Sequence, residues 1–245
     1  MRISIVVPVL NEAAGIKTCL DNLLKLEGDF EIIVSDGGSC DGTIDIVKKI
    51  VSENSIRINI KLIQNTRPGR AIQMNAGAEA AQGEIVLFMH ADCELHPSAL
   101  RSIEASLNDA NIIGGGFYKK YSKENLMLWV YRIGMNLIRT KFLKNLVGTN
   151  AMFIRKNVFF QLGSFPDTAL LEDVIFSDRM KAKGKQVFLR PHVTASSRRY
   201  RESGVLKRIW VAYKIMYLYR VKHKQPDELK QVYQHMNRSL SGKIL

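Results

Sequence analysis

The 245-residue sequence is poor in cysteine: its three cysteines, Cys19, Cys40 and Cys93, are far apart and show no Cys-x-x-Cys spacing. A small, odd and scattered set argues against a disulfide framework and against a structural zinc site. We therefore expect a protein of the reducing cytoplasm. The apolar run after Arg2 stops at Asn11 without a small-x-small cleavage site, which favours a buried strand over a signal peptide.

Other signatures are missing as well. The sequence has no P-loop, no recognisable Ser/His/Asp triad, no internal repeat and no low-complexity linker. Its segment 205–221 contains four Lys/Arg residues, which excludes an ordinary membrane span. The hydrophobic content of 46% fits an ordinary globular core, and the length allows one sizeable domain or two fused halves.

Positive charge is present in excess and is concentrated near the end of the chain. Of the net charge of +13, the segment from Arg198 onward carries +9, from twelve Lys/Arg and three Asp/Glu. A nucleic-acid-binding protein would more plausibly carry a basic face on its folded domain, so nucleic acid is the less favoured partner. A basic tail fits an anionic membrane surface or a diphosphate. The aromatic residues among the Lys/Arg of 205–221 suit a helix at a membrane interface, and a helix packed on the domain is equally consistent.

The hydrophobic pattern predicts an α/β protein. In the first half, apolar strands alternate with amphipathic helices, which is typical of a mostly parallel sheet with helical crossovers. The first helix has an apolar stripe from Ile16 to Leu24, with Asn11 as the expected cap at its start and Gly28 at its end. The glycines 114–116 indicate a strand with a close backbone approach or a bulge. We expect strands over 3–9, 31–35, 58–64, 84–89, 112–118, 151–154 and 186–189, and further helices over 43–51, 70–81, 126–138 and 173–183, the last ended by Gly184.

Four acidic stations accompany these elements. The first strand leads into Pro8-Val-Leu-Asn-Glu12, the second ends at Asp36-Gly37, the fourth leads into Phe88-Met-His-Ala-Asp92, and Glu172-Asp173 opens a later helix. Open α/β sheets bind ligands at the carboxyl ends of their strands. In this order the stations resemble the family 2 glycosyltransferases, the nucleotide-sugar-dependent enzymes with the GT-A fold. The resemblance extends from about Ile3 to about Tyr200.

The resemblance implies a Rossmann-like GT-A domain over residues 1–200, with a nucleotide-sugar half, 1–110, an acceptor half, 111–200, and a basic helical tail, 201–245. It implies inverting transfer of a sugar, with a UDP-sugar as the expected donor, to a hydroxyl of an unidentified acceptor, a lipid-linked one among the candidates. A divalent cation, Mn²⁺ or Mg²⁺, would assist. The expected location is the cytoplasm, including the inner face of the cell membrane as a peripheral protein.

The same resemblance assigns roles to the stations. Asp173 would be the base, and Glu172 would position the acceptor or its loop. Asp92 would hold the cation, and His90, which replaces the first Asp of the family's Asp-x-Asp, could add a nitrogen ligand. The remaining expected nucleotide-sugar-binding residues are Pro8, Glu12, Asp36, Gly37 and Ala91.

Arginines supply a second group of candidates. Arg67 and Arg70 flank Pro68-Gly69 at a helix start, the helix also carries Asn75, and such a helix start is a ready anion site. Arg198 and Arg199 occupy about the place where longer relatives carry a Gln-x-x-Arg-Trp clamp, which is absent here.

Each assignment has a structural alternative. Asp92 could cap the next segment, and His90 could be a satisfied histidine near the core. Asp36 could organise its turn, although Asp41 could play that role and leave Asp36 free. The acids Glu12, Glu172 and Asp173 would favour a helix dipole in any case. The arginines could simply be solvated.

Two rival functions follow. A nucleotidyltransferase would need a glycine-rich loop with Arg or Lys after the first strand, and Pro8 to Glu12 is not such a loop. A non-catalytic adaptor that binds membrane or nucleic acid on the same scaffold stays open because of His90 and Thr149.

Overall fold

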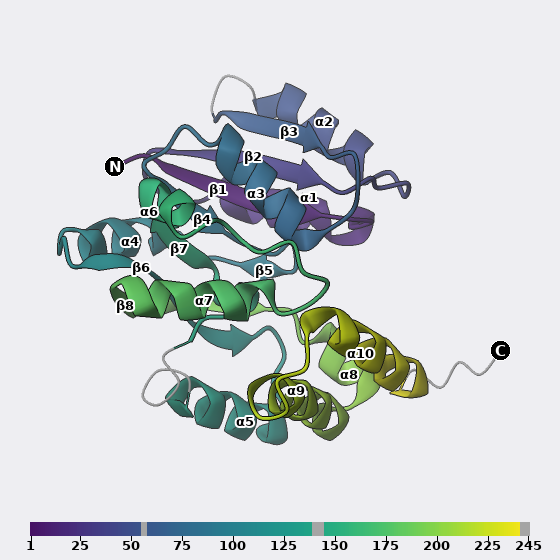
Figure 1. Ribbon diagram of the computed structural model, residues 1–245. Helices are drawn as coiled ribbons and strands as arrows, with labels where there is room; N and C mark the ends of the chain where they lie inside the picture. Colours follow the sequence, from purple (N-terminus) through teal and green to yellow (C-terminus); the bar gives the residue numbers. More distant parts are fainter. Residues whose placement is uncertain (55–57, 139–144, 241–245) are drawn as a thin grey trace.

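The computed structural model describes residues 1–54, 58–138 and 145–240, apart from the side chains of Arg199, Glu202 and 237–240. Residues 241–245 of the expected tail lie outside this range. Over the described residues the chain forms an eight-stranded sheet in the order β3-β2-β1-β4-β7-β6-β8-β5, flanked by helices (Figure 1). The strands are β1 (Ile3–Val9), β2 (Phe30–Asp36), β3 (Ile60–Gln64), β4 (Ile85–Phe88), β5 (Cys93–Glu94), β6 (Ile112–Tyr121), β7 (Met152–Arg155) and β8 (Lys185–Ala195). The helices are α1 (Ala13–Leu23), α2 (Thr43–Asn54), α3 (Arg70–Ala80), α4 (Ala99–Leu107), α5 (Leu126–Leu137), the short 3₁₀ helix η2 (Gly148–Asn150), α6 (Lys156–Gln161), α7 (Glu172–Lys183), α8 (Arg198–Ser203), α9 (Val205–Arg220) and α10 (Pro226–Leu240).

The sheet confirms the α/β prediction. The pairs β1–β2, β1–β4, β2–β3 and β6–β8 are parallel, and β4–β7, β6–β7 and β5–β8 are antiparallel. In the register, Val9 pairs with Asp36 and Val6 pairs with Phe88. The carboxyl ends of β1, β2 and β4 therefore meet at one edge, and the loops that follow them carry the first three acidic stations.

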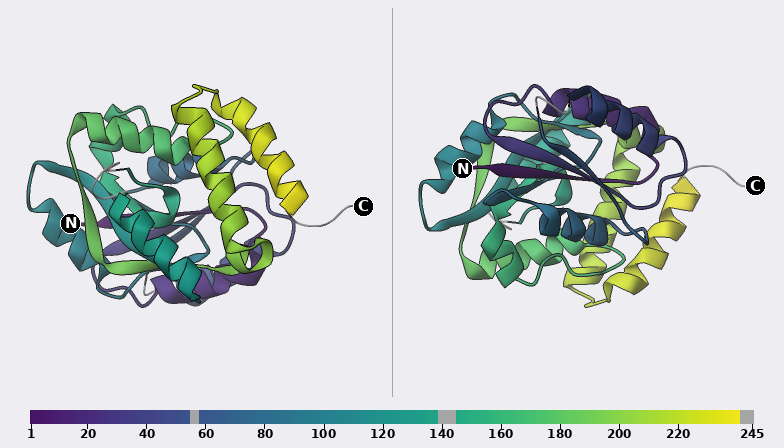
Figure 2. Two further views of the ribbon diagram at one scale, coloured as in Figure 1. Left: turned by 90° about the horizontal axis from the view of Figure 1, so that it is seen from below. Right: turned by 90° about the horizontal axis from the view of Figure 1, so that it is seen from above.

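Helices cover both faces of the sheet (Figures 1 and 2). One apolar cluster joins the sheet to α1, α2 and α4, and the other joins it to α3, α6 and α7. In α1 the expected stripe is buried at Ile16, Cys19, Leu20 and Leu23. Each large apolar side chain buried in this way stabilises the fold by about 1.5–3 kcal/mol.

The expected cap of α1 by Asn11 is wrong. Glu12 is the N-cap residue and makes no side-chain cap hydrogen bond. Asn11 has a left-handed backbone (φ 54°), and its Oδ1 accepts a hydrogen bond from the N–H of Cys40 at 2.9 Å. The asparagine is therefore used to join two loops, and α1 ends at Leu23 with Leu24 as its C-cap, before Gly28 is reached.

In the second half, the three glycines of β6 combine both expected features. A β-carbon at Gly115 would lie 2.2 Å from the carbonyl oxygen of Val187, so β8 can approach only a glycine there. A register shift between Ile112 and Gly114 marks a bulge. The strand β8 is longer than expected, and β5, α4, α6 and α8 were not expected from the sequence, whereas α9 and α10 lie within the expected helical tail.

The helices after residue 200 contact the body of the protein. Val211 and Ile215 of α9 pack with Leu229 and Met236 of α10, and Leu170 and Leu171 lie against this cluster. Arg220 forms an ion pair with Asp178 at 2.6 Å. The domain boundary at residue 200 stays a prediction. None of the helices in the described part of the chain is long and apolar enough to cross a membrane.

Candidate functional site

A buried glutamine joins the ends of β1 and β2. The Nε2 atom of Gln73, on α3, donates to the carbonyl oxygens of Val9 at 2.6 Å and of Ser35 at 2.9 Å. Because both acceptors are at the carboxyl edge, Gln73 fixes the two loops that leave it. The signal for this role in the sequence is a polar amide at a position of α3 whose buried neighbours are small or apolar.

Those two loops are also hydrogen-bonded to each other. The N–H of Glu12 donates to Thr43 Oγ1 at 2.9 Å, and the N–H of Ala13 donates to Asp41 Oδ2 at 3.0 Å. The hydrogen bonds from the Thr43 hydroxyl and from the Ala13 backbone lower the pKa of Asp41. The loops after β1 and β2 therefore form one fixed surface above the sheet edge.

Asp36 helps to build this surface. The sequence left open whether Asp36 or Asp41 organises the turn, and both aspartates take part. The fully buried Asp36 accepts hydrogen bonds through Oδ2 from the N–H groups of Gly38 at 2.7 Å and Ser39 at 3.0 Å. Gly37 lies against Gln73, and Pro8 is buried opposite Ser35 in β2.

A cavity of about 200 Å³ brings four of the predicted residues together. Glu12, Ala91, Asp92 and Arg198 all line it, and Glu94 of β5 lines it with them. Burial raises the pKa of the Cys19 thiol to about 12, and the carboxylates of Asp92, Glu12 and Glu94 contribute to that shift. Three carboxylates and one guanidinium line the cavity, so its lining is acidic. The sequence analysis missed Glu94, because Asp92 lies in a turn and the pairing of β5 with β8 brings Glu94 beside it.

This lining fits a cation that is shared with a ligand. Small divalent cations are commonly held by one or two carboxylates together with phosphate oxygens. In residues 1–54, 58–138 and 145–240, no group of three or more His, Cys, Asp or Glu could hold a metal ion. The carbonyl oxygen of the half-buried Asp92 accepts from the N–H of Ser196 at 2.9 Å, which ties its loop to the end of β8. The backbone of Asp92 is thus held at this edge of the sheet, and its side chain lines the cavity.

His90 faces a different neighbour. A β-carbon at Gly148 would lie only 2.2 Å from His90 Nε2, so the ring packs directly on the glycine backbone. As far as the chain is described, His90 is not part of the lining around Asp92. The role of His90 as a metal ligand stays a prediction.

Gly148 contacts both His90 and the fourth acidic station, Glu172-Asp173. Its N–H donates to Asp173 Oδ2 at 2.6 Å, and Asp173 Oδ1 accepts from the N–H of Val174 at 2.8 Å. Asp173 and its neighbour Glu172 are both buried at the start of α7. No sequence motif singles out Gly148, which lies 25 residues before Asp173 in the chain.

Three side chains expected to bind the nucleotide sugar contact the segment 165–172. Both ends of the Asn75 amide bond the backbone of Phe165, at 2.9 and 3.0 Å. Arg67 pairs with Asp167 at 2.7 Å, and Arg70 pairs with Glu172. These contacts hold the segment that leads into Asp173, and the role of the three residues as an anion site stays a prediction.

The Arg70 guanidinium lies beside the carboxylates of Glu172 and Asp173. Burial would lower its pKa, but the nearby carboxylates of Asp173 and Glu172 outweigh burial and raise the pKa above its ordinary value. Arg70 therefore stays charged beside both acids and compensates their burial.

In the described part of the chain, non-glycine residues with left-handed backbone adjoin two of the acidic stations and also occur elsewhere. Asn11, Ala151 and Leu171 are non-glycine residues with φ values of 54°, 47° and 66°. They stand next to Glu12, next to η2 and next to Glu172. Such residues cost about 1–3 kcal/mol each and tend to cluster at functional sites.

The remaining predicted residues are only partly placed. Arg198 is exposed and lines the acidic cavity at the start of α8. Arg199 follows it in the helix, but its side chain lies outside the described part of the structure.

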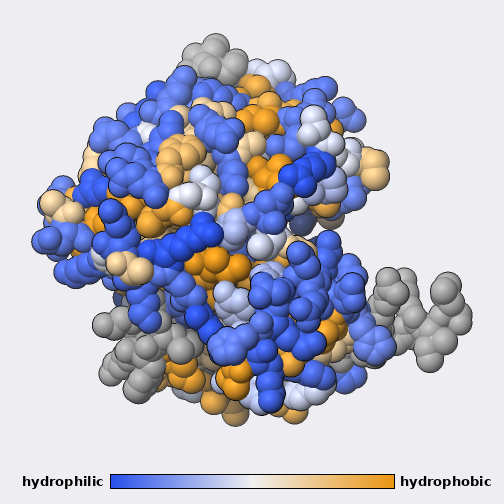
Figure 3. Space-filling model, in the orientation of Figure 1, coloured by the Kyte–Doolittle hydropathy of each residue, from blue (hydrophilic) through white to orange (hydrophobic). Residues whose placement is uncertain are grey.

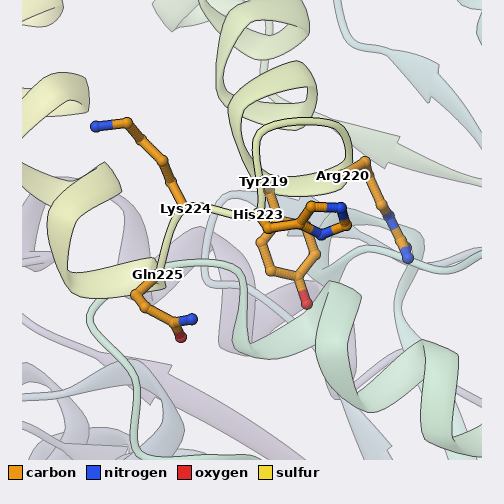
Figure 4. A pocket seen from close by; sticks show the side chains of 5 residues that line it. All are labelled: Tyr219, Arg220, His223, Lys224 and Gln225. Carbon is orange, nitrogen blue, oxygen red and sulfur yellow. The ribbon is translucent and has the colours of Figure 1, made fainter.

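A separate hollow of about 360 Å³ lies at the turn between α9 and α10, and none of the predicted residues lines it (Figure 4).

Comparisons with known proteins identify the family of the chain and its fold. The model of the family described as "Glycosyl transferase family 2" matches residues 4–162. Glycosyltransferase AglE of Haloferax volcanii is 26% identical over 173 residues, which cover 67% of this chain and 56% of that protein, so the chain spans little more than half of this relative. A PGL/p-HBAD biosynthesis glycosyltransferase of Mycobacterium bovis is 29% identical over 211 residues, 83% of this chain and 78% of that protein. An undecaprenyl-phosphate 4-deoxy-4-formamido-L-arabinose transferase of Aeromonas hydrophila is 26% identical over 117 residues, 46% of this chain and 36% of that protein.

Solved structures resemble the chain over nearly its whole length. The mannosyltransferase PcManGT from Pyrobaculum calidifontis, in complex with GDP-Man and Mn²⁺, has a TM-score of 0.73 at 22% identity and covers 98% of this chain and 69% of its own. Residues 1–349 of S. aureus TarS, in complex with UDP-GlcNAc, have a TM-score of 0.62 at 18% identity and cover 98% of this chain and 74% of their own. The fold is that of GT-A glycosyltransferases.

Proposed function

The chain belongs to glycosyl transferase family 2, and from that premise we propose a specific reaction: inverting transfer of a sugar from a UDP-sugar to an acceptor hydroxyl, assisted by a divalent cation. Glycosyltransferase activity with a nucleotide-sugar donor follows from the family and its structural neighbours. The same findings favour an enzyme over the non-catalytic adaptor. The observation that carries the finer proposal is the acidic cavity with Asp92 at the carboxyl edge of the sheet.

The nucleotide is assigned to the loops after β1 and β2. The buried Asp36 accepts hydrogen bonds from the N–H groups of Gly38 and Ser39 and from the Ser39 hydroxyl, and an N–H of a pyrimidine base would take the acceptor capacity that these bonds leave. Such a bond selects a base by its donors, which an apolar pocket cannot do. A neighbour in complex with UDP-GlcNAc supports uridine, and a neighbour in complex with GDP-Man makes guanosine the alternative to test.

The diphosphate is assigned to the acidic cavity. Asp92 would hold the cation, with Glu12 and Glu94 adding negative charge around it and Arg198 at its rim. When bound, the cation neutralises the charge that develops on the leaving diphosphate. His90 then acts through its packing on Gly148, and its role as a metal ligand stays an alternative.

Asp173 is assigned the role of base. The acceptor hydroxyl oxygen forms a bond to the anomeric carbon, the bond from that carbon to the diphosphate oxygen breaks on the opposite face, and the hydroxyl proton goes to Asp173. One carboxylate suffices for this direct displacement, and general-base assistance contributes about 10²–10⁴ in rate. The hydrogen bond from Gly148 fixes the carboxylate, and the ion pair of Glu172 with Arg70 fixes the helix start beside it.

The acceptor is proposed to be a hydroxyl compound carried by a lipid. One relative is named for transfer to undecaprenyl phosphate, which supports a lipid carrier without identifying this acceptor.

A donor screen tests the proposal. The purified chain is incubated with UDP- and GDP-sugars and Mn²⁺ in water, whose hydroxyl serves as the stand-in acceptor, and release of the nucleotide is measured. We expect release from one UDP-sugar, and loss of that release in the Asp173→Asn variant. Release only from GDP-sugars would overturn the choice of nucleotide, and unchanged release from Asp173→Asn would overturn the assignment of the base.

A further inference from the structure

The outer face of α9 carries a row of exposed apolar side chains. Its members are Leu206, Trp210, Tyr213, Tyr217 and Val221, each between 50% and 66% exposed. Their spacing of three or four residues puts them on one side of a helix. Five large apolar residues in one exposed row are more than the scattered surface hydrophobics of an ordinary protein.

This row is not the core face of the helix. The core face consists of Val211 and Ile215, which pack on α10 and on the segment of Leu170 and Leu171. The helix therefore has one apolar face toward the protein and a second toward solvent.

Helix α5 adds a second exposed apolar row. Leu126, Met127, Trp129, Val130 and Leu137 are all exposed, while Leu128 on the same helix is buried. α5 and α9 lie at the same end of the molecule in both Figure 1 and the left view of Figure 2. Residues from the starts of both helices, Met127 and Leu206 among them, line one open groove of about 890 Å³. We call these two rows with their groove the α5–α9 face. In Figure 3, hydrophobic residues are visible along the lower edge of the molecule, where Figure 1 shows α5 and α9.

Charge on the two helices has one sign. Neither α5 nor α9 contains Asp or Glu, and together they carry Arg132, Lys207, Arg208, Lys214 and Arg220. Glu124 and Asp178, from outside the two helices, pair with Arg132 and Arg220. Lys207 and Lys214 are exposed beside the apolar row, and the Lys214 ammonium lies 4.8 Å from the centre of the Trp210 ring.

We propose that the α5–α9 face docks on an anionic lipid bilayer. Exposed Trp, Tyr and Leu side chains would enter the boundary between head groups and acyl chains, and the lysines would contact lipid phosphates. A symmetric contact between two copies would instead bring cations of the same face close to one another, which is unfavourable without a compensating acid. The proposed docking surface therefore differs from the basic tail of the sequence analysis. It adds α5, which precedes that tail, and it leaves out the buried face of α10. The inference concerns docking alone and does not depend on the reaction at the site.

Intrinsic fluorescence is the direct test, because the chain has two tryptophans and both, Trp129 and Trp210, lie on this face. The intact chain is titrated with vesicles of phosphatidylcholine alone and of phosphatidylcholine with an equal amount of phosphatidylglycerol, at low and high salt. We expect the emission to move to shorter wavelength with the anionic vesicles at low salt, and the shift to be lost at high salt. An unshifted spectrum with anionic vesicles at low salt would overturn the proposal.

Paired charge reversals give the matched control. Lys207→Glu with Lys214→Glu should lower the partition coefficient at least about 25-fold, since each lysine near an anionic surface contributes roughly fivefold. Lys48→Glu with Lys49→Glu makes the same change on the exposed side of α2, far from this face, and should leave partitioning within about twofold. Equal losses in both double variants would show a response to net charge only and would overturn the assignment to this face.

A wavelength shift that depends on protein concentration without vesicles would overturn the proposal in favour of self-association. Circular dichroism and thermal melting of each variant exclude unfolding as the cause.

Discussion

The Nε2 atom of His90 lies so close to Gly148 that a β-carbon at residue 148 would be 2.2 Å away from it. The N–H of the same glycine donates to Asp173 at 2.6 Å. One residue without a side chain therefore contacts both His90, in the middle of the Phe88–Asp92 segment, and the proposed base, although the two are far apart in the sequence.

Gly148→Ala is expected to lower the transfer rate by about 100-fold, because the added methyl group must displace His90 or the hydrogen bond to Asp173, and small misplacements of reacting groups have effects of that size. Nucleotide affinity should change much less. Gly134→Ala is the control, since a β-carbon there meets no atom within 4 Å. Steady-state kinetics and calorimetry measure the two quantities, and equal losses of binding and transfer would contradict this role of Gly148.

The ion pair of Arg70 with Glu172 should matter for stability. Arg70→Ala leaves the buried carboxylate of Glu172 without its cation, so we expect a loss of about 1–3 kcal/mol in the free energy of unfolding. Arg67→Ala removes an exposed pair from the same segment and should cost about 0–1 kcal/mol. Urea denaturation of the two variants compares them. A smaller loss for Arg70→Ala than for Arg67→Ala would mean that the segment is held in some other way.

Asp173 should act in chemistry and not in donor binding. Asp173→Asn keeps the side-chain shape and removes the basic oxygen, so we expect a 10²–10⁴-fold lower transfer rate with nearly unchanged nucleotide affinity. Single-turnover kinetics separates the two. If nucleotide affinity falls in parallel with the rate, Asp173 belongs to the donor site.

Stability at high pH should report the acidic cavity through Cys19. Its pKa is raised from an ordinary value of 9.0 to about 12, by burial first and by Asp92, Glu12 and Glu94 next. A folded-state pKa above the unfolded value gives stability that is fully present below pH 9 and is lost as the pH rises toward 12. The expected slope from this group is roughly 1.4 kcal/mol per pH unit within that window.

Cys19→Ser supplies the comparison, because a serine hydroxyl does not titrate there. Urea denaturation from pH 8 to pH 11 should show a shallower decline for the variant than for the natural chain. Identical slopes would show that the thiol is not held in the neutral form as described.

Parts of the site could be predicted from sequence because local patterns determine them. Parallel strands put their carboxyl ends at one edge, so the loops with Glu12, Asp36 and Asp92 could be expected together, and the stripe from Ile16 to Leu23 defines the core face of α1. The partners of α3 could not be predicted in this way. Asn75 binds the backbone of Phe165, ninety residues away, and no local pattern encodes that choice.

Other contacts of the site also join residues that are far apart in the sequence, or depend on choices that no local pattern determines. Glu94 reaches the acidic cavity because β5 pairs with β8, about a hundred residues later in the chain. Asp36 and Asp41 looked interchangeable as turn formers in the sequence, yet they bond different N–H groups in the structure.

The most direct test of the account is calorimetric titration of UDP into the natural chain and into Asp92→Asn, with Mn²⁺ and with excess chelator. We expect the natural chain to bind UDP clearly more tightly with Mn²⁺, and Asp92→Asn to lose that gain while its thermal stability is retained, because the variant lacks the charge that anchors the cation. Equal UDP affinity with Mn²⁺ and with chelator in the natural chain, or an undiminished gain in Asp92→Asn, would contradict the assignment of the acidic cavity to a cation-bound diphosphate.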